Sequence, residues 1–238
     1  MATKSMRQIV FDIETSGCKL TDLSESQQEY LLREALKETD ETIRQQKTDD
    51  AERFLSLYPF TAKVVAIGMF DVQNEKSFVY YESAKDGETE EEWHSEDGKV
   101  VYKAFTEKAM LERFWHVMEK TDQVITFNGR NFDIPFLMMR SAKLKVKPSK
   151  NFMGYRFDTK THVDLLEQFT FYSATRKFNL DFYCHAFDVQ TPKSHEISGM
   201  EVQNLYQAGR TKDIAIYCGK DIVATYRLFK IWEDYLKF

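Results

Sequence analysis

The chain has 238 residues, of which 42% are hydrophobic and 14% aromatic, and its formal net charge is −5. This length suits one large domain or two small ones, and the apolar fraction is ordinary for a globular protein. The negative charge argues mildly against a uniformly basic nucleic-acid binder, although it says little about any single face of the molecule.

The chain lacks the sequence signals of a membrane or secreted protein. No apolar run approaches the roughly 18 residues of a membrane-spanning helix, and Met1–Gln8 is short and polar. Cys18, Cys184 and Cys218 form no CxxC pair, which favours reduced thiols over disulfides or a zinc site. We therefore expect a cytoplasmic protein that does not associate with membranes.

The N-terminal part of the chain predicts strands around a helical segment. The apolar run Gln8–Ile13 predicts a buried strand. Thr21–Arg53 contains no Gly or Pro, many helix formers and few apolar residues, which predicts one or two solvated helices. We interpret this stretch as a helical insertion at about 21–57. Ala62–Asp71 and Ser77–Tyr81 predict two strands joined by a turn.

An acidic segment separates these strands from a predicted helix. Ser83–Gly98 is polar and acidic and predicts a loop, and Val100–Tyr102 predicts a short edge strand. Thr106 is the expected cap of a helix that runs to about Lys120. The apolar face of this helix consists of Met110, Leu111, Phe114, Trp115 and Met118.

The remaining elements alternate. Asp122–Phe127 predicts a strand that leads through a loop into a helix from about Phe132, with a proline tolerated in its first turn. His162–Leu166 predicts a strand, Asn179–Phe187 a helix, and a long amphipathic helix begins at Thr211. This order indicates an α/β sheet domain, and without repeats or linkers we expect residues 1–238 to form a single domain.

Two carboxylates, Asp12 and Glu14, stand at the end of the first predicted strand. Because side chains alternate along a strand, both project from the same face. Two carboxylates this close repel each other unless a cation lies between them, and their hard oxygen ligands suit Mg²⁺ or Mn²⁺. The alternative interpretation is a polar strand end that leads into a turn at Thr15–Gly17.

Two further motifs carry acidic residues. Asn128–Asp133 (NGRNFD) joins a strand to a helix, where Asp133 is either a site residue or a helix cap. Tyr217 and Asp221 stand four residues apart on the last helix, so they share a face. Tyr and Asp at this spacing are also common on solvated helices.

In this order, the DxE, NxxxFD and YxxxD motifs resemble the three exonuclease motifs of the DEDD (DnaQ-like) superfamily. Ile216 stands where one subgroup has a histidine, so the chain resembles the Tyr subgroup, which includes the proofreading domains of family-B DNA polymerases. It is similar in particular to stand-alone predicted 3′–5′ exonucleases related to those domains. The resemblance runs from Ile9 to about Leu228, and Arg176–Ala186 and Lys193–Val202 resemble segments that precede the third motif.

The resemblance implies a ribonuclease H-like α/β fold, a mixed sheet flanked by helices. It implies that Asp12, Glu14, Asp133 and Asp221 hold two divalent cations, Mg²⁺ or Mn²⁺, and that Tyr217 orients the attacking water. The implied activity is 3′–5′ exonuclease: removal of nucleoside 5′-monophosphates from the 3′ end of single-stranded DNA or RNA. We expect DNA rather than RNA, although no residue identifies the sugar.

Most of the secondary site residues have two interpretations. Asn128 either holds the loop or contacts the substrate backbone, and Phe132 either stacks on a terminal base or packs in the core. Thr15 is assigned to the substrate. Asp164 either supports the site or is structural. Two basic clusters either follow phosphates or are solvated: Arg140, Lys143, Lys145, Lys147 and Lys150, and Arg176 with Lys177.

Two other functions fit the same fold. One is a catalytically inactive nucleic-acid-binding module, because a fold does not determine a function. The other is an endonuclease that acts on RNA–DNA hybrids. The presence of all four carboxylates favours an enzyme, and the pair of Tyr217 and Asp221 favours the exonuclease. Protein partners remain unknown from the sequence.

Overall fold

A mixed seven-stranded sheet forms the centre of the computed structural model, which describes residues 6–83, 91–191 and 201–237. The strand order is β4-β5-β3-β2-β1-β6-β7. The strands are β1 (Gln8–Gly17), β2 (Ala62–Asp71), β3 (Lys76–Glu82), β4 (Glu92–His94), β5 (Val100–Phe105), β6 (Gln123–Thr126) and β7 (His162–Asp164). The pairs β1–β2, β2–β3 and β4–β5 are antiparallel, and the other three are parallel, which confirms the predicted mixed α/β sheet.

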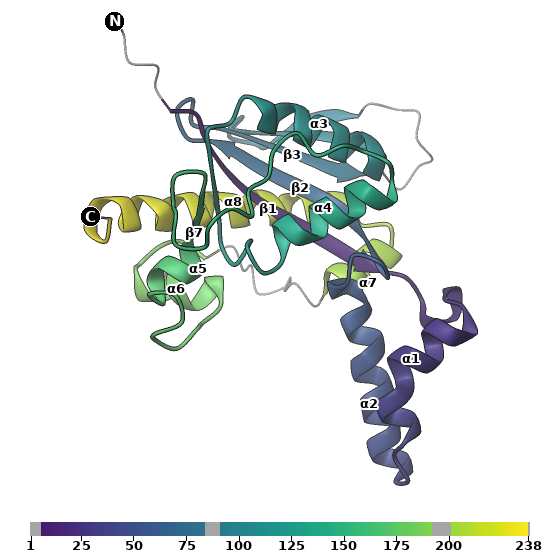
Figure 1. Ribbon diagram of the computed structural model, residues 1–238. Coiled ribbons are helices and arrows are strands. Elements are labelled where there is room, and N and C mark those ends of the chain that lie inside the picture. Colours follow the sequence, from purple (N-terminus) through teal and green to yellow (C-terminus); the bar gives the residue numbers. More distant parts are fainter. Residues whose placement is uncertain (1–5, 84–90, 192–200, 238) are drawn as a thin grey trace, which may run out of the picture.

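Helices cover both faces of this sheet, and two more project away from it (Figure 1). They are α1 (Glu25–Leu36), α2 (Glu41–Phe54), α3 (Glu107–Glu119), α4 (Asp133–Lys143), α5 (Leu165–Phe169), α6 (Leu180–Ala186), α7 (Val202–Gln207) and α8 (Thr211–Tyr235). The long α8 crosses one face, where it contacts β1, β2 and β3, and α3 and α4 cover the opposite face. Among the described residues, no helix is both long and apolar enough to cross a bilayer.

Each face of the sheet has its own hydrophobic core. On the α8 side, buried residues such as Val10, Ile222 and Phe229 form one cluster. On the α3 side, Phe11 meets Phe114 edge to face at 5.2 Å, within a second cluster. Alternation along β1 sends Val10 to one cluster and Phe11 to the other, as expected for a strand buried on both faces.

The helix predicted between Thr106 and about Lys120 is confirmed as α3. Thr106 caps α3 by accepting a hydrogen bond from the N–H of Ala109 at 3.3 Å. The five residues predicted to form its apolar face are all buried against the sheet.

The first strand is longer than predicted. Its ladder with β2 continues from Ile9 opposite Asp71 to Gly17 opposite Ala62, with a bulge between Glu14 and Thr15. Asp12 and Glu14 therefore lie inside the strand, and the expected strand end with a turn at Thr15–Gly17 is wrong. The polar side chains of Thr15 and Ser16 are tolerated there because their hydroxyls are hydrogen-bonded, to the carbonyl oxygen of Ser56 and to Gln203 Oε1.

The acidic segment is not a loop throughout. Residues 84–90 lie outside the described part of the chain, but β4 forms within the predicted loop Ser83–Gly98. Trp93 of β4 stacks on Tyr102 of β5, with ring centroids 3.8 Å apart. The edge position therefore belongs to β4, and β5 lies one strand further in. Charged residues on such an edge strand hide its alternating pattern.

Two other expectations change. The strand predicted at His162–Leu166 ends at Asp164, whose carboxylate accepts hydrogen bonds from the N–H groups of Leu166 and Glu167 and so begins α5. Arg140 of the predicted basic cluster is buried rather than solvated. Its guanidinium donates to both carboxylate oxygens of Glu107, at 2.7 and 2.6 Å, and to the carbonyl oxygen of Pro59.

The helical segment after β1 forms an arm, defined here as α1 and α2, that projects away from the sheet (Figure 1). Only Ala35 of α1 is buried, and no residue of α2 is. Two solvated helices are therefore present, as predicted. Most of the segment Lys193–Val202, named above, lies outside the described residues.

Candidate active site

The first two carboxylates lie on the middle of β1, on the face that α8 crosses. Asp12 stands opposite Gly68 of β2, and Glu14 opposite Ala66. A Cβ on Gly68 would lie 2.9 Å from the Sγ of Cys218 and from a methyl of Ile222. Because Gly68 has no side chain, α8 can approach the sheet beside Asp12. The Sγ of Cys218 lies 3.7 Å from the main-chain oxygen of Asp12, to which the thiol donates.

The last helix brings Tyr217 and Asp221 to these carboxylates. Both side chains are buried, with 9% and 7% of the residue exposed, and their side chains are joined by a hydrogen bond. Burial raises the pKa of Tyr217 far above its ordinary value, and the negative charges of Asp221, Glu14 and Asp12 raise it further. Both effects disfavour loss of the phenol proton.

The third element is the start of α4. Asp133 is its first residue and is 3% exposed. Its Oδ1 accepts a hydrogen bond of 3.1 Å from the main-chain N–H of Ile13, between the two carboxylates of β1. The Asp133 carboxylate thus reaches across to β1 and is not simply a surface helix cap.

The loop before Asp133 is held in place by Asp164. The Asp164 carboxylate accepts hydrogen bonds from the N–H groups of Asn128, at 3.0 Å, and Arg130, at 2.9 Å. Asn128 has a left-handed backbone, with φ of 65°. A Cβ on Gly129 would lie only 2.4 Å from Thr126 Oγ1, so this tight turn requires glycine. Asp164 therefore positions the loop that carries Asp133.

The carboxylates form one strongly repulsive cluster. Burial raises the pKa of Glu14 well above its usual value, and the charges of Asp12, Asp221 and Asp133 raise it further. The pKa values of Asp12 and Asp133 are raised in the same way, first by burial and then by Asp221 and Asp12 respectively. A buried group of like charges at this density calls for a cation.

The donors in the cluster suit a hard divalent ion. A carboxylate oxygen of Asp12, one of Glu14 and the Sγ of Cys218 all lie within 4.8 Å of one another. Burial and the nearby carboxylates raise the pKa of the Cys218 thiol, which disfavours the thiolate form that binds metals. The carboxylate oxygens that remain are the ligands that Mg²⁺ and Mn²⁺ prefer.

The three residues assigned to the substrate have different surroundings. The Thr15 hydroxyl donates to the carbonyl oxygen of Ser56, at 2.7 Å. The Asn128 side chain accepts from the Asn131 amide at 3.0 Å. Phe132 is half-buried and packs on Phe136, with ring centroids 5.4 Å apart.

Sequence reasoning missed two residues that shape the site. Gly68 is one, although an isolated glycine inside a predicted strand is a known sign of close backbone approach. Gln203 of α7 is the other. Its Oε1 accepts from the Ser16 hydroxyl, at 2.8 Å, and from the Gly17 N–H, at 2.6 Å, and so holds the end of β1. No pattern in the sequence identifies this second contact.

Comparisons with known proteins identify the family of the chain. Residues 53–235 match the family described as predicted 3′–5′ exonuclease related to the exonuclease domain of PolB. The matched range includes Asp133, Tyr217 and Asp221 and begins after Asp12 and Glu14.

Archaeal DNA polymerases are the curated relatives. The DNA polymerase of Desulfurococcus sp. (strain Tok) is 30% identical over 155 residues, which are 58% of this chain and 20% of the polymerase. That of Thermococcus gorgonarius is 30% identical over 154 residues, with the same shares. The chain thus spans about a fifth of the length of these relatives.

A solved structure shows the same fold. It is the family B DNA polymerase from Pyrobaculum calidifontis, with a TM-score of 0.60 and 15% identity over 97% of this chain and 25% of that chain. This similarity supports the ribonuclease H-like arrangement predicted from the motifs. From the family match over most of its length, the chain belongs to the family of predicted 3′–5′ exonucleases related to the exonuclease domain of PolB.

Proposed function

We propose that the chain is a metal-dependent 3′–5′ exonuclease that releases nucleoside 5′-monophosphates from single-stranded nucleic acid. The observation that carries this proposal is the convergence of four carboxylates and one phenol from β1, α4 and α8. Membership of a family of predicted exonucleases supports it. We further propose that residues 1–238 form one exonuclease domain with a helical insertion at about 21–57.

Asp12, Glu14, Asp133 and Asp221 would hold two divalent ions, Mg²⁺ or Mn²⁺. When bound, such ions stabilise the charge on the attacking and leaving oxygens of an in-line displacement at phosphorus. The four side chains contribute the negative charge and hard oxygen donors, and their mutual repulsion favours binding over an empty site.

Tyr217 would position the reacting groups rather than remove a proton. A tyrosine with an ordinary pKa near 10 already keeps its O–H at neutral pH, and burial raises the pKa of Tyr217 further, so we propose that the phenol acts as a hydrogen-bond donor and not as a base. The hydrogen bond with Asp221 orients the phenol within the site. We propose that it orients the water that attacks the terminal phosphodiester.

The proposed substrate is a 3′ end of single-stranded DNA, with RNA as the alternative. The names of the polymerase relatives favour DNA. Asn128 and Phe132, on either side of the loop that leads to Asp133, would border the terminal nucleotide. For Thr15, whose hydroxyl donates to Ser56, we propose that it holds the end of β1 beside the substrate.

The proposal is tested by a time course on 5′-labelled single strands, one DNA and one RNA of identical sequence, with Mg²⁺ or Mn²⁺. The expected result is a ladder that shortens from the 3′ end, faster on DNA, and is lost with chelator. The matched control is Asp12→Asn, which removes a charge at nearly constant volume and should abolish shortening. Folding of this variant is checked by thermal unfolding.

The contrary outcomes separate the alternatives. A ladder of equal rate in Asp12→Asn would remove the carboxylate cluster from the mechanism. Binding of the strands without any shortening would instead support the inactive nucleic-acid-binding module.

A further inference from the structure

Three exposed aromatic side chains and one half-buried ring lie in the segments that flank β7 and α5. We call Tyr155, Phe157, Phe171 and Tyr172 the aromatic platform. Tyr155 is 74% exposed, Phe157 54% and Phe171 57%. The ring of Phe157 lies 5.6 Å from that of Tyr155 and 4.6 Å from that of Tyr172, centroid to centroid. Clustered exposed rings of this kind mark binding surfaces more often than isolated ones.

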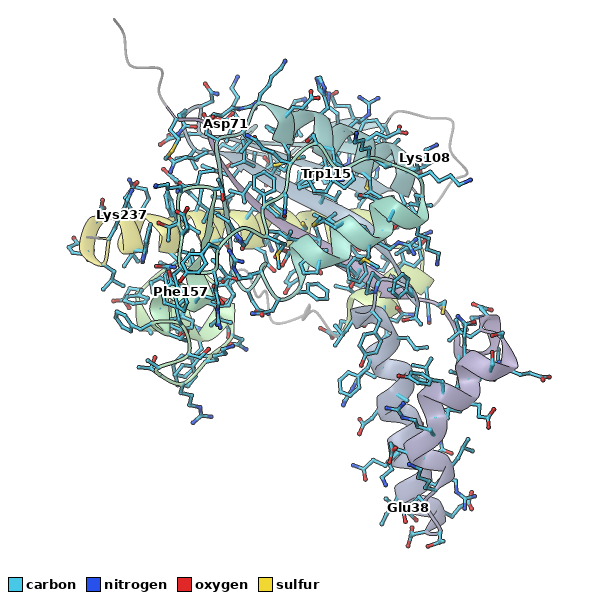
Figure 2. The ribbon with its side chains drawn as sticks, in the orientation of Figure 1. Glu38, Asp71, Lys108, Trp115, Phe157 and Lys237 are labelled. Atoms are coloured by element: carbon cyan, nitrogen blue, oxygen red, sulfur yellow. The ribbon has the colours of Figure 1, made fainter. Side chains whose placement is uncertain are left out.

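Figure 2 shows where the platform lies on the molecule. Phe157 is at the end formed by α5 and α6, and Glu38 marks the tip of the arm at the opposite end. The platform joins the stretch before β7 to the loop after α5.

The loop after α5 holds its rings outward in a strained backbone. Phe171, Tyr172 and Ser173 all have left-handed backbones, with φ of 48°, 58° and 75°. Such a conformation costs about 1–2 kcal/mol per residue when the residue is not glycine. The N–H of Tyr172 donates to the carbonyl oxygen of Glu167, at 2.7 Å, and keeps the loop in this shape. Because the Phe171 ring stays exposed, it buries no apolar surface that would offset this strain. Backbone strain without such compensation favours a role in binding.

A buried carboxylate connects the platform to the site loop. Glu167, 3% exposed, accepts from Arg156 Nε at 2.7 Å and pairs with Arg130 Nε at 3.4 Å. Arg130 belongs to the loop that leads to Asp133, and its Nη1 also donates to the carbonyl oxygen of Gly154. Tyr155 and Phe157 flank Arg156 in sequence. The platform is therefore attached to the same loop that supplies Asp133.

The charge around the platform is opposite to that of the whole chain. Residues 155–177, the segment that carries the platform, contain four Lys or Arg and three Asp or Glu, whereas the chain carries a net −5. Asp164 and Glu167, two of those three acids, are buried and hydrogen-bonded as described. The exposed charge is therefore positive. Exposed rings can stack on bases, and the cations beside them can bind phosphates. Single-stranded nucleic acid offers both groups together.

We propose that the aromatic platform binds the bases of single-stranded nucleic acid that lie 5′ of the nucleotide being removed. The rings stack on the bases, and the surrounding cations contact phosphates. This inference rests on the proposed exonuclease function for the direction of the strand, but binding at the platform itself requires no hydrolysis.

The first test measures binding without turnover. Fluorescein-labelled single-stranded DNA of about 16 nucleotides is titrated with the full chain in EDTA, and anisotropy is recorded. Tyr155→Ala and Phe171→Asn should each weaken binding about fivefold or more, the loss expected when one stacking ring is removed. The matched control is Tyr30→Ala on the arm, a ring of similar exposure (65%), which should bind as the wild type does.

Phe171→Asn also separates binding from a structural role. Asparagine tolerates the left-handed backbone far better than phenylalanine, so the melting temperature should stay constant or rise while binding falls. A lower melting temperature with unchanged binding would show that the ring is structural and would overturn the proposal.

A second measurement distinguishes the platform from the active site. On a long strand the platform variants should have a higher KM than the wild type. On a dinucleotide, which is too short to reach the platform, they should hydrolyse at the wild-type rate.

The contrary outcomes are distinguishable. If the wild type is active and the variants keep its DNA affinity and its KM, the platform is overturned and the proposed function stands. If the platform variants bind more weakly but the wild type hydrolyses nothing, the platform stands and the proposed exonuclease function is overturned. Unchanged DNA binding with altered self-association on size exclusion would assign the surface to a protein interface.

Discussion

At the scale of single residues, Tyr217 is the sharpest test of the proposed chemistry. Tyr217→Phe removes only the hydroxyl, and we expect hydrolysis to slow on the order of 100-fold, the effect of losing one well-placed donor. Because Tyr217 supplies no carboxylate, the rise in melting temperature on adding Mn²⁺ should remain. Single-turnover rates and thermal unfolding with and without Mn²⁺ measure the two effects. A variant with the full rate would exclude Tyr217 from the mechanism.

His162 makes the stability of the protein depend on pH. It is 3% exposed and hydrogen-bonded to the Thr126 hydroxyl at 2.9 Å, and burial, with the charge of Arg130, lowers its pKa to about 3. The unfolded chain takes up a proton below about pH 6.5, whereas the folded protein does not. The contribution of His162 to stability is therefore complete above that pH and falls as the pH drops toward 3.

The expected size of this effect can be measured. Between pH 7 and pH 5 the free energy of unfolding should fall by about 2 kcal/mol more in the wild type than in His162→Gln. Urea unfolding of both proteins at the two pH values gives the difference. An identical pH dependence would mean that the pKa of His162 is the same in the folded and the unfolded protein.

At the scale of elements, the contact between β2 and α8 decides whether the carboxylates meet. Gly68→Ala would place a methyl 2.9 Å from Cys218 Sγ and from Ile222. We expect a loss of about 1–3 kcal/mol in unfolding free energy, together with a fall in hydrolysis as Asp221 moves away from Asp12. The matched control is Gly154→Ala, where the nearest heavy atom to the new Cβ, Thr161 Oγ1, is 4.0 Å away.

Urea unfolding and kcat measure this pair of variants. Loss of stability with an unchanged kcat would show that α8 adjusts locally without moving Asp221. Equal unfolding free energies and equal kcat values for the two alanine variants would mean that the space between Gly68 and α8 can accommodate a methyl group.

The elements also show where sequence patterns lose information. The helix α3 was predictable because five apolar residues at helical spacing all face one core. The strand β4 was not predictable, because its only apolar side chain, Trp93, stands between Glu92 and His94. Its pairing with β5 forms only in the folded sheet. The end of β1 was misjudged for the same reason: its polar residues Thr15 and Ser16 pair with β2, a partner that local sequence does not reveal.

At the scale of the whole molecule, the arm is separable from the sheet. An ideal Cβ on Gly17 would lie 2.8 Å from the main-chain nitrogen of Ser56, so the chain leaves and re-enters the sheet at one place. Replacing residues 20–54 by a short Gly-Ser linker should therefore change the unfolding free energy by only about 1 kcal/mol, as expected for a change of loop length. Leu55, 2% exposed, is kept because it is buried.

Chemical unfolding of the linker variant measures this prediction. A loss of several kcal/mol, or failure to fold, would show that the arm stabilises the sheet. The matched control is a variant of the same arm with Ile43→Ser, an exposed position that should leave stability unchanged.

The sequence alone determined most of the strands and helices in chain order, the α/β class, and the identity and spacing of the four carboxylates and Tyr217. These are local properties, since periodicity and motif spacing lie within single segments. The tertiary structure alone decided that Gly68 admits α8, that Asp164 holds the loop before Asp133, and that Arg140 is buried against Glu107. Each of these depends on residues from segments far apart in the chain, whose distance in space no local pattern encodes.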